Sequence, residues 1–333
     1  MGGSMSLCFM LTAGRGTRLK PYTDTRAKPT LPLLNMPLAH YGFYLARQGG
    51  FEHFLMNKHH LPTQVEKLAQ SLSDHCREIQ TVDETAQLLG SGGALWNARD
   101  ILHKHEFFMI ANGDEVMIPR NERVLNHLVH RFQETGSLAC LLTCDHPDLL
   151  KTLKPVWTTP DQTVVGFGMN KPPGDPRPKH YTGYKVFSRK ILDWLPNGES
   201  NIFYEVLTEA LHQGEDLFHL PIEDVAWFET GNPTSFFNAS NALASHHWAA
   251  VQQRRRFFGW KRLYKFENKG QQLVTFDSYG EARLKDVAGH VVIGDHVHWP
   301  TEKALDNCIV FPQTDLANPE SAEAGVLRPE PSS

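Results

Sequence analysis

The sequence lacks several features that would place it in common classes of protein. No apolar run reaches the roughly 20 residues that a membrane-spanning helix needs, and we expect neither a signal peptide nor a membrane partner. Cysteine is scarce, with five residues that are odd in number and scattered, which predicts reduced thiols in a cytoplasmic protein. The formal net charge is only -4, and this near-neutral balance argues against a nucleic-acid partner.

Familiar catalytic and nucleotide-binding signatures are also missing. The glycines near residue 14 are not followed by the Gly-Lys-Ser/Thr of a Walker loop. The third glycine of the dinucleotide-binding fingerprint is absent, which disfavours an oxidoreductase. The 18 histidines show no zinc-ligand spacing, and no Ser-His-Asp arrangement is legible. The function must therefore be sought in other motifs.

A short apolar run, residues 7–11, leads into a loop that is rich in glycine and cations. Residues 11–32 read LTAGRGTRLKPYTDTRAKPTLP and contain five basic side chains and one acid, a local excess of four positive charges. Glycine allows the backbone to approach oxyanions closely and to donate amide hydrogens to them. We therefore predict a buried strand followed by a phosphate-holding loop. An ordinary solvated turn is the alternative for these residues alone.

The chain continues with strands and helices in alternation. Apolar spacing predicts helices over residues 37–48, 62–72 and 119–134, and strands over residues 51–56, 79–82, 107–111 and 138–143. Later strands are expected over residues 161–167, 181–187, 217–220 and 226–228. This rhythm predicts an α/β fold with a parallel sheet whose ligands bind at the carboxyl ends of the strands.

The first loop resembles the opening motif of the sugar-phosphate nucleotidyltransferases, the NDP-sugar pyrophosphorylases. That motif reads G-x-G-T-R-L and continues through a threonine-containing spacer to P-K-P. The matching residues are Gly14, Arg15, Gly16, Thr17, Arg18, Leu19, Pro21, Thr23, Lys28 and Pro29. Ala27 stands where the first proline of P-K-P is usual. The resemblance implies a Rossmann-like three-layer fold with a mainly parallel central sheet.

The same resemblance implies roles for this loop. Arg18 would steady the leaving pyrophosphate, and Lys28 would contact the reacting phosphates, so both are catalytic candidates. The nucleotide-binding candidates are Leu11, Ala13, Gly14, Arg15, Gly16 and Thr17.

A second glycine-rich loop, ETAQLLGSGGAL, spans residues 84–95. It resembles the L-G-T-G-G-A-L segment that holds the nucleobase in this family, with Ser91 in the place of the usual threonine. The resemblance implies that Gly90 and Gly92 contact the base through backbone groups, with Gln87 or Thr85 as side-chain candidates. A structural turn before a helix is the alternative.

The predicted strand at residues 107–111 ends in Asn112, Gly113 and Asp114. A carboxylate at the carboxyl end of a buried strand can coordinate Mg2+, which prefers hard oxygen ligands and shares them with phosphates. A simple turn is the alternative. The family's N-G-D motif matches all three residues, so the resemblance implies that Asp114 is a catalytic metal ligand and that Asn112 contacts the sugar phosphate.

The second metal position departs from the family. Residues 227–233, WFETGNP, resemble the motif W-x-D-V-G-T-P, and Glu229 takes the place of the second metal-binding aspartate. We predict that Glu229 is a Mg2+ ligand because it keeps the carboxylate. Octahedral Mg2+ tolerates poor geometry badly, so a weakened or lost metal site stays open as the alternative.

Further residues are implied in sugar-phosphate binding. Lys171 and Pro172 match the family's E-K-P, in which the lysine binds the sugar phosphate, but Asn170 replaces the glutamate that binds sugar hydroxyls. Asparagine can still donate and accept hydrogen bonds, although it adds no charge. Gly183 and Glu205 are the remaining candidates. A surface loop is the structural alternative for the segment that contains Asn170 and Lys171. A solvated helix is the alternative for the segment that contains Glu205.

The composition changes beyond residue 257. We expect a nucleotidyltransferase catalytic domain over residues 1–257 and a small β-rich region over residues 258–316, which resembles one or two coils of a left-handed β-helix. Residues 317–333 are expected to form a disordered tail. Residues 233–257 are predicted as one long helix, with the arginines at 254–256 solvated near its end.

Together the motifs predict transfer of a nucleotidyl group from an NTP to a sugar 1-phosphate, with Mg2+ as cofactor. The sequence looks closest to mannose-1-phosphate guanylyltransferases and to bacterial hexose-1-phosphate and muramate-1-phosphate uridylyltransferases, so GTP is placed narrowly ahead of UTP. A non-catalytic relative that binds a nucleotide sugar is the alternative. A homodimer is left open.

Overall fold

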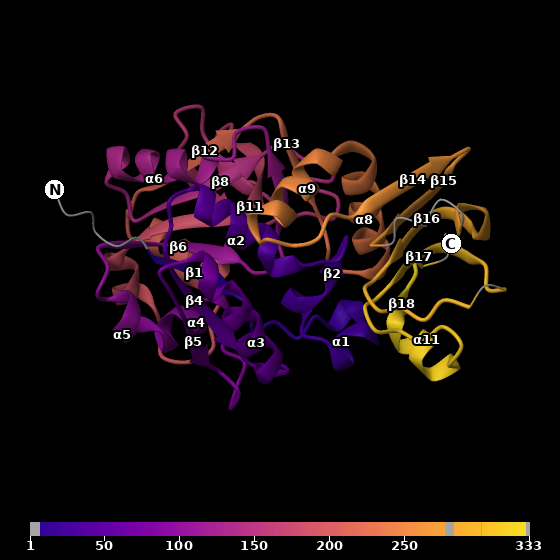
Figure 1. The fold of residues 1–333 in the computed structure, drawn as a ribbon. Coiled ribbons are helices and arrows are strands. Elements are labelled where there is room, and N and C mark those ends of the chain that lie inside the picture. The colour runs from indigo at the N-terminus through magenta and orange to yellow at the C-terminus, as the bar shows by residue number, and fades with distance from the viewer. Residues whose placement is uncertain (1–6, 277–282, 301, 331–333) are drawn as a thin grey trace. The chain divides into compact units, whose positions relative to one another are not determined.

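The computed structural model describes residues 7–276, 283–300 and 302–330. Within that part, the chain divides into two compact units (Figure 1). Unit 1 contains the described parts of residues 1–14 and 42–227, and unit 2 contains those of residues 15–41 and 228–333. Residues 15–41 therefore pack with the C-terminal part of the chain, whereas composition alone suggested a boundary near residue 257.

Unit 1 is built on a central sheet of nine strands. Its strands are β1 (Leu7–Leu11), β4 (His53–Lys58), β5 (Glu78–Asp83), β6 (Phe107–Asn112), β8 (Ala139–Cys144), β9 (Val156–Thr158), β10 (Val164–Phe167), β11 (Arg177–Ser188) and β12 (Leu217–Ile222). The order is β10-β9-β11-β6-β1-β4-β5, and β8 pairs with both β11 and β12.

The central strands run parallel, as the sequence predicts. β1 pairs in parallel with β4 and β6, β4 with β5, and β8 with β12, whereas β11 runs antiparallel to β6 and β8. Both faces of β1 are covered, which explains its continuous apolar run. The predicted mainly parallel α/β sheet is thus confirmed.

Helices cover this sheet through their apolar faces. α3 (Pro62–Leu72) buries Val65, Leu68, Ala69 and Leu72 and packs against β4 and β5, beside which it lies in Figure 1. α6 (Val124–Thr135) packs against β8, β11 and β12. The remaining helices of this region are α2 (Leu38–Gln48), α4 (Gly90–Asn97), α5 (Arg99–Leu102), the π-helix η5 (Ile202–Leu207), α7 (Thr208–His212) and the 3-10 segments η3 (Ser73–His75) and η4 (Arg189–Trp194).

Three predicted elements need correction. β7 (Val116–Pro119) precedes α6, so the helix begins at Val124 and not at residue 119. β13 (Val225–Phe228) pairs with β7 in a separate two-stranded sheet, so it does not close the central sheet. The predicted long helix is two helices, α8 (Pro233–His246) and α9 (Trp248–Phe257), because His247 leaves the helical backbone conformation with φ -125° and ψ 24°.

Unit 2 contains a second, separate sheet, also as predicted. Its order is β14-β15-β16-β17-β18, with parallel pairing from β15 to β17 and antiparallel pairing at both edges. The bounds are β14 (Tyr264–Asn268), β15 (Gln271–Thr275), β16 (Val287–Ile293), β17 (Leu305–Val310) and β18 (Val326–Leu327). Residues 317–330 contain α11 (Pro319–Gly325) and β18, in a segment that we expected to be disordered.

The N-terminal piece of unit 2 consists of short elements. They are η1 (Thr17–Leu19), α1 (Tyr22–Thr25), η2 (Lys28–Thr30), β2 (Pro32–Leu33) and β3 (Met36–Pro37). Its side chains are held by the C-terminal part of the same unit: the Tyr22 hydroxyl donates to the carbonyl of Val326 at 3.2 Å, and the Asn35 amide donates to the carbonyl of Ile293 at 2.9 Å.

Two arginines of α9 are buried, so the prediction that the arginines at 254–256 are solvated is wrong for them. Arg254 and Arg255 are 0% and 2% exposed. The Arg255 guanidinium donates to the carbonyls of Asn35 at 2.9 Å and of Lys261 at 2.8 and 2.9 Å, and burial lowers its pKa to about 10. Arg255 thus ties two loops to the helix, whereas the Arg254 guanidinium donates to the Ala250 carbonyl of its own helix at 3.2 Å.

The structure shows no helix, over its described residues, whose length and apolar character would allow it to cross a membrane.

Candidate functional site

The path of the first loop after β1 is fixed by Asn57, a residue that the sequence analysis did not identify. The side-chain oxygen of Asn57, at the end of β4, accepts hydrogen bonds from the backbone N–H groups of Thr12 at 2.6 Å and Ala13 at 3.2 Å. The Thr12 hydroxyl donates in turn to the Asn57 carbonyl at 2.5 Å. The start of the loop, with Leu11 and Ala13, is therefore fixed at the carboxyl edge of the sheet.

Asn57 also connects this loop to the next one. Its amide nitrogen donates to the Glu84 carboxylate at 2.9 Å, and Glu84 opens the second glycine-rich loop. Burial raises the pKa of Glu84, and the bond from Asn57 opposes that shift. The second carboxylate oxygen of Glu84 has no hydrogen-bond partner among the residues that the structure describes. One asparagine thus joins the carboxyl ends of β1, β4 and β5.

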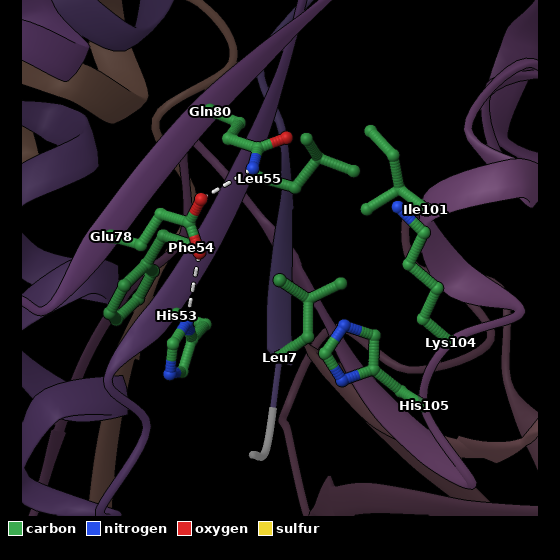
Figure 2. Close-up of a pocket in the computed structure, with 9 residues that line it drawn as sticks. All are labelled: Leu7, His53, Phe54, Leu55, Glu78, Gln80, Ile101, Lys104 and His105. Atoms are coloured by element: carbon green, nitrogen blue, oxygen red, sulfur yellow. Dashed lines mark hydrogen bonds and ion pairs between the residues drawn. The ribbon is translucent and has the colours of Figure 1, made fainter.

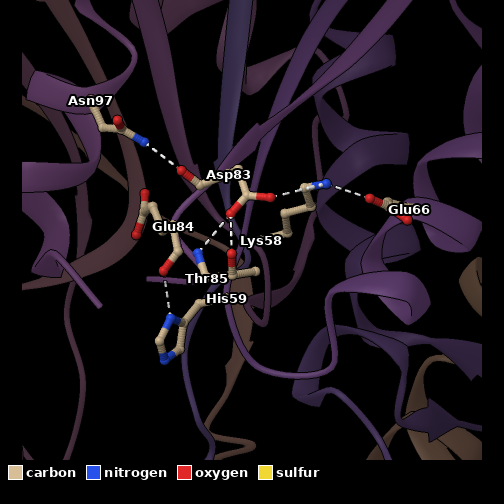
Figure 3. Close-up of polar contacts among 7 residues, drawn as sticks. All are labelled: Lys58, His59, Glu66, Asp83, Glu84, Thr85 and Asn97. Atoms are coloured by element: carbon tan, nitrogen blue, oxygen red, sulfur yellow. Dashed lines mark hydrogen bonds and ion pairs between the residues drawn. The ribbon is translucent and has the colours of Figure 1, made fainter. Parts of the chain in front are cut away.

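Polar contacts around the end of β5 hold the second loop from outside (Figure 3). The Asp83 carboxylate accepts from both the backbone N–H and the hydroxyl of Thr85, and it lies 3.3 Å from the Lys58 ammonium, which also pairs with Glu66. Asn97 of α4 donates to the Asp83 carbonyl at 2.9 Å. These bonds fix the path from β5 into α4.

The glycines of the second loop are explained by packing. A Cβ atom on Gly90 would lie 2.7 Å from the Ser200 carbonyl, and Cβ atoms on Gly92 and Gly93 would overlap Ser200 and the Gly198 carbonyl. The N–H of Gly92 donates to the Ser200 carbonyl at 2.8 Å. Gln87 is exposed on the surface of this loop. The nucleobase role of Gln87, Gly90 and Gly92 stays a prediction.

The end of β6 lies against the start of the first loop. A Cβ atom on Gly113 would overlap the Thr12 side chain and lie 2.8 Å from the Leu11 carbonyl, so only glycine permits this approach. Asn112 pairs with Leu11 in the sheet. The structure therefore brings Leu11, Asn112 and Asp114 to one edge, where Asp114 is half-buried.

Glu115 is a further residue that the sequence analysis missed. Its carboxylate accepts from the Asn112 amide at 3.0 Å and from the Trp227 indole at 2.7 Å. A Cβ atom on Gly183 would overlap the Glu115 side chain, and Gly183 has a φ of 97°. Gly183 therefore lies at the same edge as Asn112, where a larger residue would overlap the Glu115 side chain. The only sequence signal for Glu115 was its place beside Asp114.

The other predicted sugar-phosphate residues are exposed. Lys171 lies 3.4 Å from the Asp175 carboxylate, and Asn170 precedes it in the same surface loop. The Glu205 carboxylate accepts from the backbone N–H of Asn201 at 3.2 Å, so it caps the start of η5. The contacts that the structure shows for these residues do not join them to Asn112 or Gly183.

In unit 2, the cationic part of the first loop folds over its own downstream segment. Gly16 has a φ of 61°, and a Cβ atom there would lie 2.9 Å from the Thr23 methyl and 3.2 Å from the Lys28 Cβ. The Thr23 hydroxyl donates to the Gly16 carbonyl at 2.9 Å. Gly16 and Lys28 are therefore neighbours, whereas Arg15 and Thr17 are exposed.

Unit 2 also brings Arg18 and Glu229 together. An Arg18 guanidinium nitrogen lies 3.6 Å from a Glu229 oxygen, which accepts the N–H of Gly231 at 2.8 Å. A Cβ atom on Gly231 would overlap the ends of both side chains, so a larger residue there would displace the ion pair. The two predicted functional residues thus form an ion pair, with Arg18 mostly exposed.

The predicted metal ligands differ in their fit to Mg2+. The Asp114 carboxylate supplies hard oxygen donors at a strand end, where the oxygens of the neighbouring Glu115 are already engaged. At Glu229 one oxygen is held by a cation and a backbone N–H. Across residues 7–276, 283–300 and 302–330, no cluster of three or more His, Cys, Asp or Glu side chains could hold a metal ion. Asp114 and Glu229 both keep the hard oxygen donors that Mg2+ prefers.

A cavity of about 300 Å3 lies at the opposite, amino ends of β1, β4 and β5 (Figure 2). Figure 2 shows Glu78 and Gln80 on one wall and Ile101 and Lys104 on the other. The Glu78 carboxylate lies 3.2 Å from the His53 ring nitrogen. None of the predicted site residues lines this cavity.

Comparison with known families gives a match over most of the chain. The profile described as "Nucleotidyl transferase" matches residues 8–246. Among curated proteins, the chain is 24% identical over 259 residues to a UTP--glucose-1-phosphate uridylyltransferase of Synechocystis. It is 26% identical over 235 residues to a mannose-1-phosphate guanylyltransferase of Mycobacterium tuberculosis. These alignments cover 73% and 70% of this chain but only 65% and 63% of the two relatives.

Solved structures share the fold. An inositol-1-phosphate CTP transferase from T. maritima is similar with a TM-score of 0.61 and 19% identity, covering 77% of this chain and 98% of that one. A UDP-glucose pyrophosphorylase from Acinetobacter baumanii is similar with a TM-score of 0.59 and 18% identity, covering 75% of this chain and 98% of that one.

Proposed function

The chain belongs to the nucleotidyl transferase family, and on that premise we propose that it transfers a nucleotidyl group from an NTP to a sugar 1-phosphate. The products are an NDP-sugar and pyrophosphate. The observation that carries the proposal is the family match over residues 8–246, which includes the glycine-rich cationic loop and the strand end that bears Asp114. Relatives named for uridylyl and guanylyl transfer to sugar 1-phosphates support it.

The reaction needs positioning and charge neutralisation more than proton transfer. A phosphate oxygen of the sugar 1-phosphate forms a bond to the α-phosphorus of the NTP, and the bond from that phosphorus to the departing pyrophosphate breaks in line. The attacking phosphate is already ionised at neutral pH. No strong general base is required, which agrees with a site that offers cations and backbone amides.

Residues of the first loop carry the phosphate contacts in this proposal. Lys28 binds the reacting phosphates and Arg18 the leaving pyrophosphate, while the backbone at Gly14 and Gly16 can approach the nucleotide closely. Asp114 is the residue that we assign to Mg2+, with Glu229 as its second predicted ligand. When bound, Mg2+ supplies positive charge to the phosphate oxygens.

The substrates follow from the resemblance and from the named relatives. We propose GTP ahead of UTP and a hexose 1-phosphate as acceptor, with mannose 1-phosphate first among them. Lys171 would bind the sugar phosphate, while Asn112, Asn170, Gly183 and Glu205 would face the sugar.

The contact between Arg18 and Glu229 favours a second candidate function. Because a Glu229 oxygen is held by Arg18 at 3.6 Å and by a backbone N–H, it is a poorer metal ligand than a freely presented carboxylate. A relative that binds a nucleotide sugar without turning it over would not need that ligand.

One assay separates these candidates. Pyrophosphate release would be measured with Mg2+ across a grid of the four NTPs and hexose, hexosamine and muramic acid 1-phosphates. We expect turnover in the substrate combinations that pair GTP or UTP with one sugar phosphate. Absence of pyrophosphate release in every combination, together with a thermal shift caused by nucleotide sugars, would reject the transferase and support the binding protein. Restoration of turnover by Glu229→Asp would then identify this residue as the cause.

A further inference from the structure

The Glu115 carboxylate lies between two side chains of unit 1 that reach it from different strands. Its Oε1 atom accepts from the Asn112 amide at 3.0 Å, and its Oε2 atom accepts from the Trp227 indole at 2.7 Å. Glu115 directly precedes β7, and Trp227 lies in β13, which pairs with β7. The pairing of these two strands therefore brings the carboxylate and the indole together, while Asn112 approaches from the end of β6.

The Trp227 ring is itself held in place by packing. Its centroid lies 4.1 Å from that of the His180 ring and 5.4 Å from that of the His146 ring, and both contacts are edge-to-face. Such edge-to-face packing of rings is favourable, and His180 is buried. The indole therefore offers Glu115 a hydrogen-bond donor in a fixed position.

The chemistry of these three groups determines which way the Asn112 amide points. An indole nitrogen only donates, and a glutamate that is ionised, as is ordinary at neutral pH, only accepts. The amide atom that faces Glu115 must therefore be the nitrogen of Asn112. The Asn112 oxygen is then turned away from Glu115, and no group of the described chain donates a hydrogen bond to it.

A second predicted sugar residue lies against the same carboxylate. Gly183 has a φ of 97°, and a Cβ atom there would overlap the Glu115 side chain. The family resemblance implies sugar binding for Asn112 and Gly183 but gives Glu115 no role. The structure shows that one glutamate supports both of them.

An outward oxygen limits what the Asn112 side chain can recognise. Because an amide oxygen accepts and does not donate, it cannot form a hydrogen bond with an ionised phosphate group, whose oxygens also only accept. It can accept from a hydroxyl group, the donor that sugars carry. A substrate that lacks this donor would leave the oxygen unpaired, which is the kind of mismatch that binding sites reject most strongly.

We propose that Glu115 is a positioning residue that holds the Asn112 oxygen toward a hydroxyl group of the sugar 1-phosphate, and so makes that hydroxyl a requirement for an efficient acceptor. Trp227 sets the polarity of the arrangement, because its indole can only donate to Glu115. This inference rests on the proposed function. It adds how the site distinguishes one hydroxyl of the acceptor from a group of similar size that cannot donate.

The first test is a double-mutant cycle between Glu115 and the acceptor. Each hydroxyl of the best sugar 1-phosphate in the grid would be replaced in turn by fluorine, which cannot donate. We expect one replacement to lower the wild-type kcat/KM by at least about tenfold. Glu115→Gln should shrink that ratio about fivefold or more, because Trp227 takes the glutamine oxygen and the glutamine NH2 turns the Asn112 oxygen inward.

The cycle has an internal correction and a matched control. Fluorine also withdraws electrons from the phosphate, but this effect is common to both enzymes and cancels in the comparison. Glu134→Gln removes the same charge from an exposed glutamate of α6, which lies 3.3 Å from the His130 ring, and should leave every ratio unchanged. If each ratio were the same in the wild type and in Glu115→Gln, the proposal would be overturned.

The second test exchanges the charge between the two residues. Asn112→Asp alone places two carboxylates together and should lower kcat/KM. When Asn112→Asp and Glu115→Gln are combined, the glutamine NH2 donates to the aspartate, whose second oxygen again faces the hydroxyl. We expect the fluorine ratio of the double variant to return to within about threefold of the wild-type ratio. A double variant no better than either single variant would indicate a merely structural role and reject the positioning role.

Two further measurements distinguish other partners for the Asn112 oxygen. The Mg2+ concentration for half-maximal turnover and the penalty for the deoxyribose form of the NTP would be compared in the wild type and in Glu115→Gln. We expect the deoxyribose penalty to be the same in both. A higher Mg2+ requirement with an unchanged fluorine ratio would assign the oxygen to the metal, and a change confined to the deoxyribose penalty would assign it to the ribose. Either result would overturn the proposal.

Calorimetry keeps this inference separate from the proposed function. Mannose 1-phosphate and glucose 1-phosphate, each beside its singly fluorinated forms, would be titrated into the full chain with Mg2+ and a non-hydrolysable NTP analogue. Tighter binding of a hydroxyl form that Glu115→Gln removes, without turnover in the wild type, would reject the transferase but support the role of Glu115. Turnover without such a dependence would reject only that role, and binding of neither form would reject both.

Discussion

Two glycine-rich loops follow strands of one sheet, and their glycines meet different physical demands. A Cβ atom on Gly14, in the loop after β1, would meet nothing within 4 Å among the described atoms. Cβ atoms on Gly92 and Gly93, after β5, would overlap the backbone and side chain of residues 198–200. At Gly14 the first loop therefore keeps space open, although its Gly16 packs against Thr23 and Lys28, whereas the second loop has the space beside Gly92 and Gly93 filled by the protein itself.

This difference shows what a glycine motif can and cannot indicate. Both loops resemble the family's motifs, and spacing alone does not separate a backbone that approaches a ligand from one that approaches another segment. The surroundings of the missing side chain make that distinction. Variants that add a single methyl group, or that cut the link between the loops, test it directly.

The largest effect is expected from Gly93→Ala. The added methyl would overlap the Gly198 carbonyl, a backbone atom that cannot rotate away, so we expect the free energy of unfolding to fall by about 3 kcal/mol or more. Gly14→Ala is the matched control and should change it by less than about 0.5 kcal/mol while raising the KM for the NTP. Urea denaturation of both variants checks this, and equal stability losses would erase the distinction between the loops.

Asn57→Ala should disturb both loops at once. It leaves the buried N–H of Thr12 and the carboxylate of Glu84 without their partner, and each such group costs about 1–3 kcal/mol. We expect a loss of roughly 2–3 kcal/mol in unfolding free energy together with reduced turnover. Asn97→Ala, which removes one exposed bond to the Asp83 carbonyl, serves as control and should cost less than about 1 kcal/mol. If the two variants were equally stable, Asn57 would not couple the loops.

Lys28→Met probes the cationic side of the first loop. Loss of one fixed positive charge on the reacting phosphates should cost about 2 kcal/mol of transition-state stabilisation, roughly a 30-fold fall in kcat/KM. Lys20→Met removes an exposed lysine of the same loop, paired with Asp24 at 2.9 Å, and should change kcat/KM by less than about twofold. Pyrophosphate release measures both. Wild-type kcat/KM in Lys28→Met would exclude this lysine from the reaction.

The smallest effect concerns the pH dependence of the second loop. Burial raises the folded-state pKa of Glu84, so the folded protein holds this proton to a higher pH than the unfolded chain does. Stability therefore falls as the pH rises from the ordinary glutamate pKa through the raised one. Relative to Glu84→Gln, the wild type should lose stability over that window and stay level above it. Urea midpoints between pH 4 and 7 would show this, and parallel curves would contradict it.

Most of the sheet could be predicted because local patterns specify it. Continuous apolar runs marked β1, β6 and β8 as strands buried on both faces, and the spacing of Val65, Leu68 and Leu72 marked α3. Errors arose where the outcome depended on distant partners. Nothing near Arg255 in the sequence announces that the carbonyl of Asn35, 220 residues away, will accept its hydrogen bond.

Prediction of the site residues was limited in the same way, by contacts between distant parts of the chain. The motifs identified Arg18, Lys28 and Asp114 by residue type and order, and these assignments stay predictions of function. Asn57 and Glu115 were missed because their roles depend on which strand ends lie side by side. A polar residue directly after a buried strand was the available signal for Asn57, yet several residues meet that description and only the register of β4 with β1 selects it.

Unit 2 is formed by two segments that are far apart in the chain, and this affects how it folds during synthesis on the ribosome. Residues 15–41 emerge early, but their partners come late: the Tyr22 hydroxyl bonds to Val326, and the Arg26 guanidinium bonds to the Ala324 carbonyl and lies 5.0 Å from the Phe311 ring centroid. At about 5–20 residues per second, the segment that carries Lys28 waits for roughly 15–60 seconds before those partners exist. A nascent chain therefore lacks these partners until residues 311–326 have been made, and a stop codon before them would remove the partners altogether.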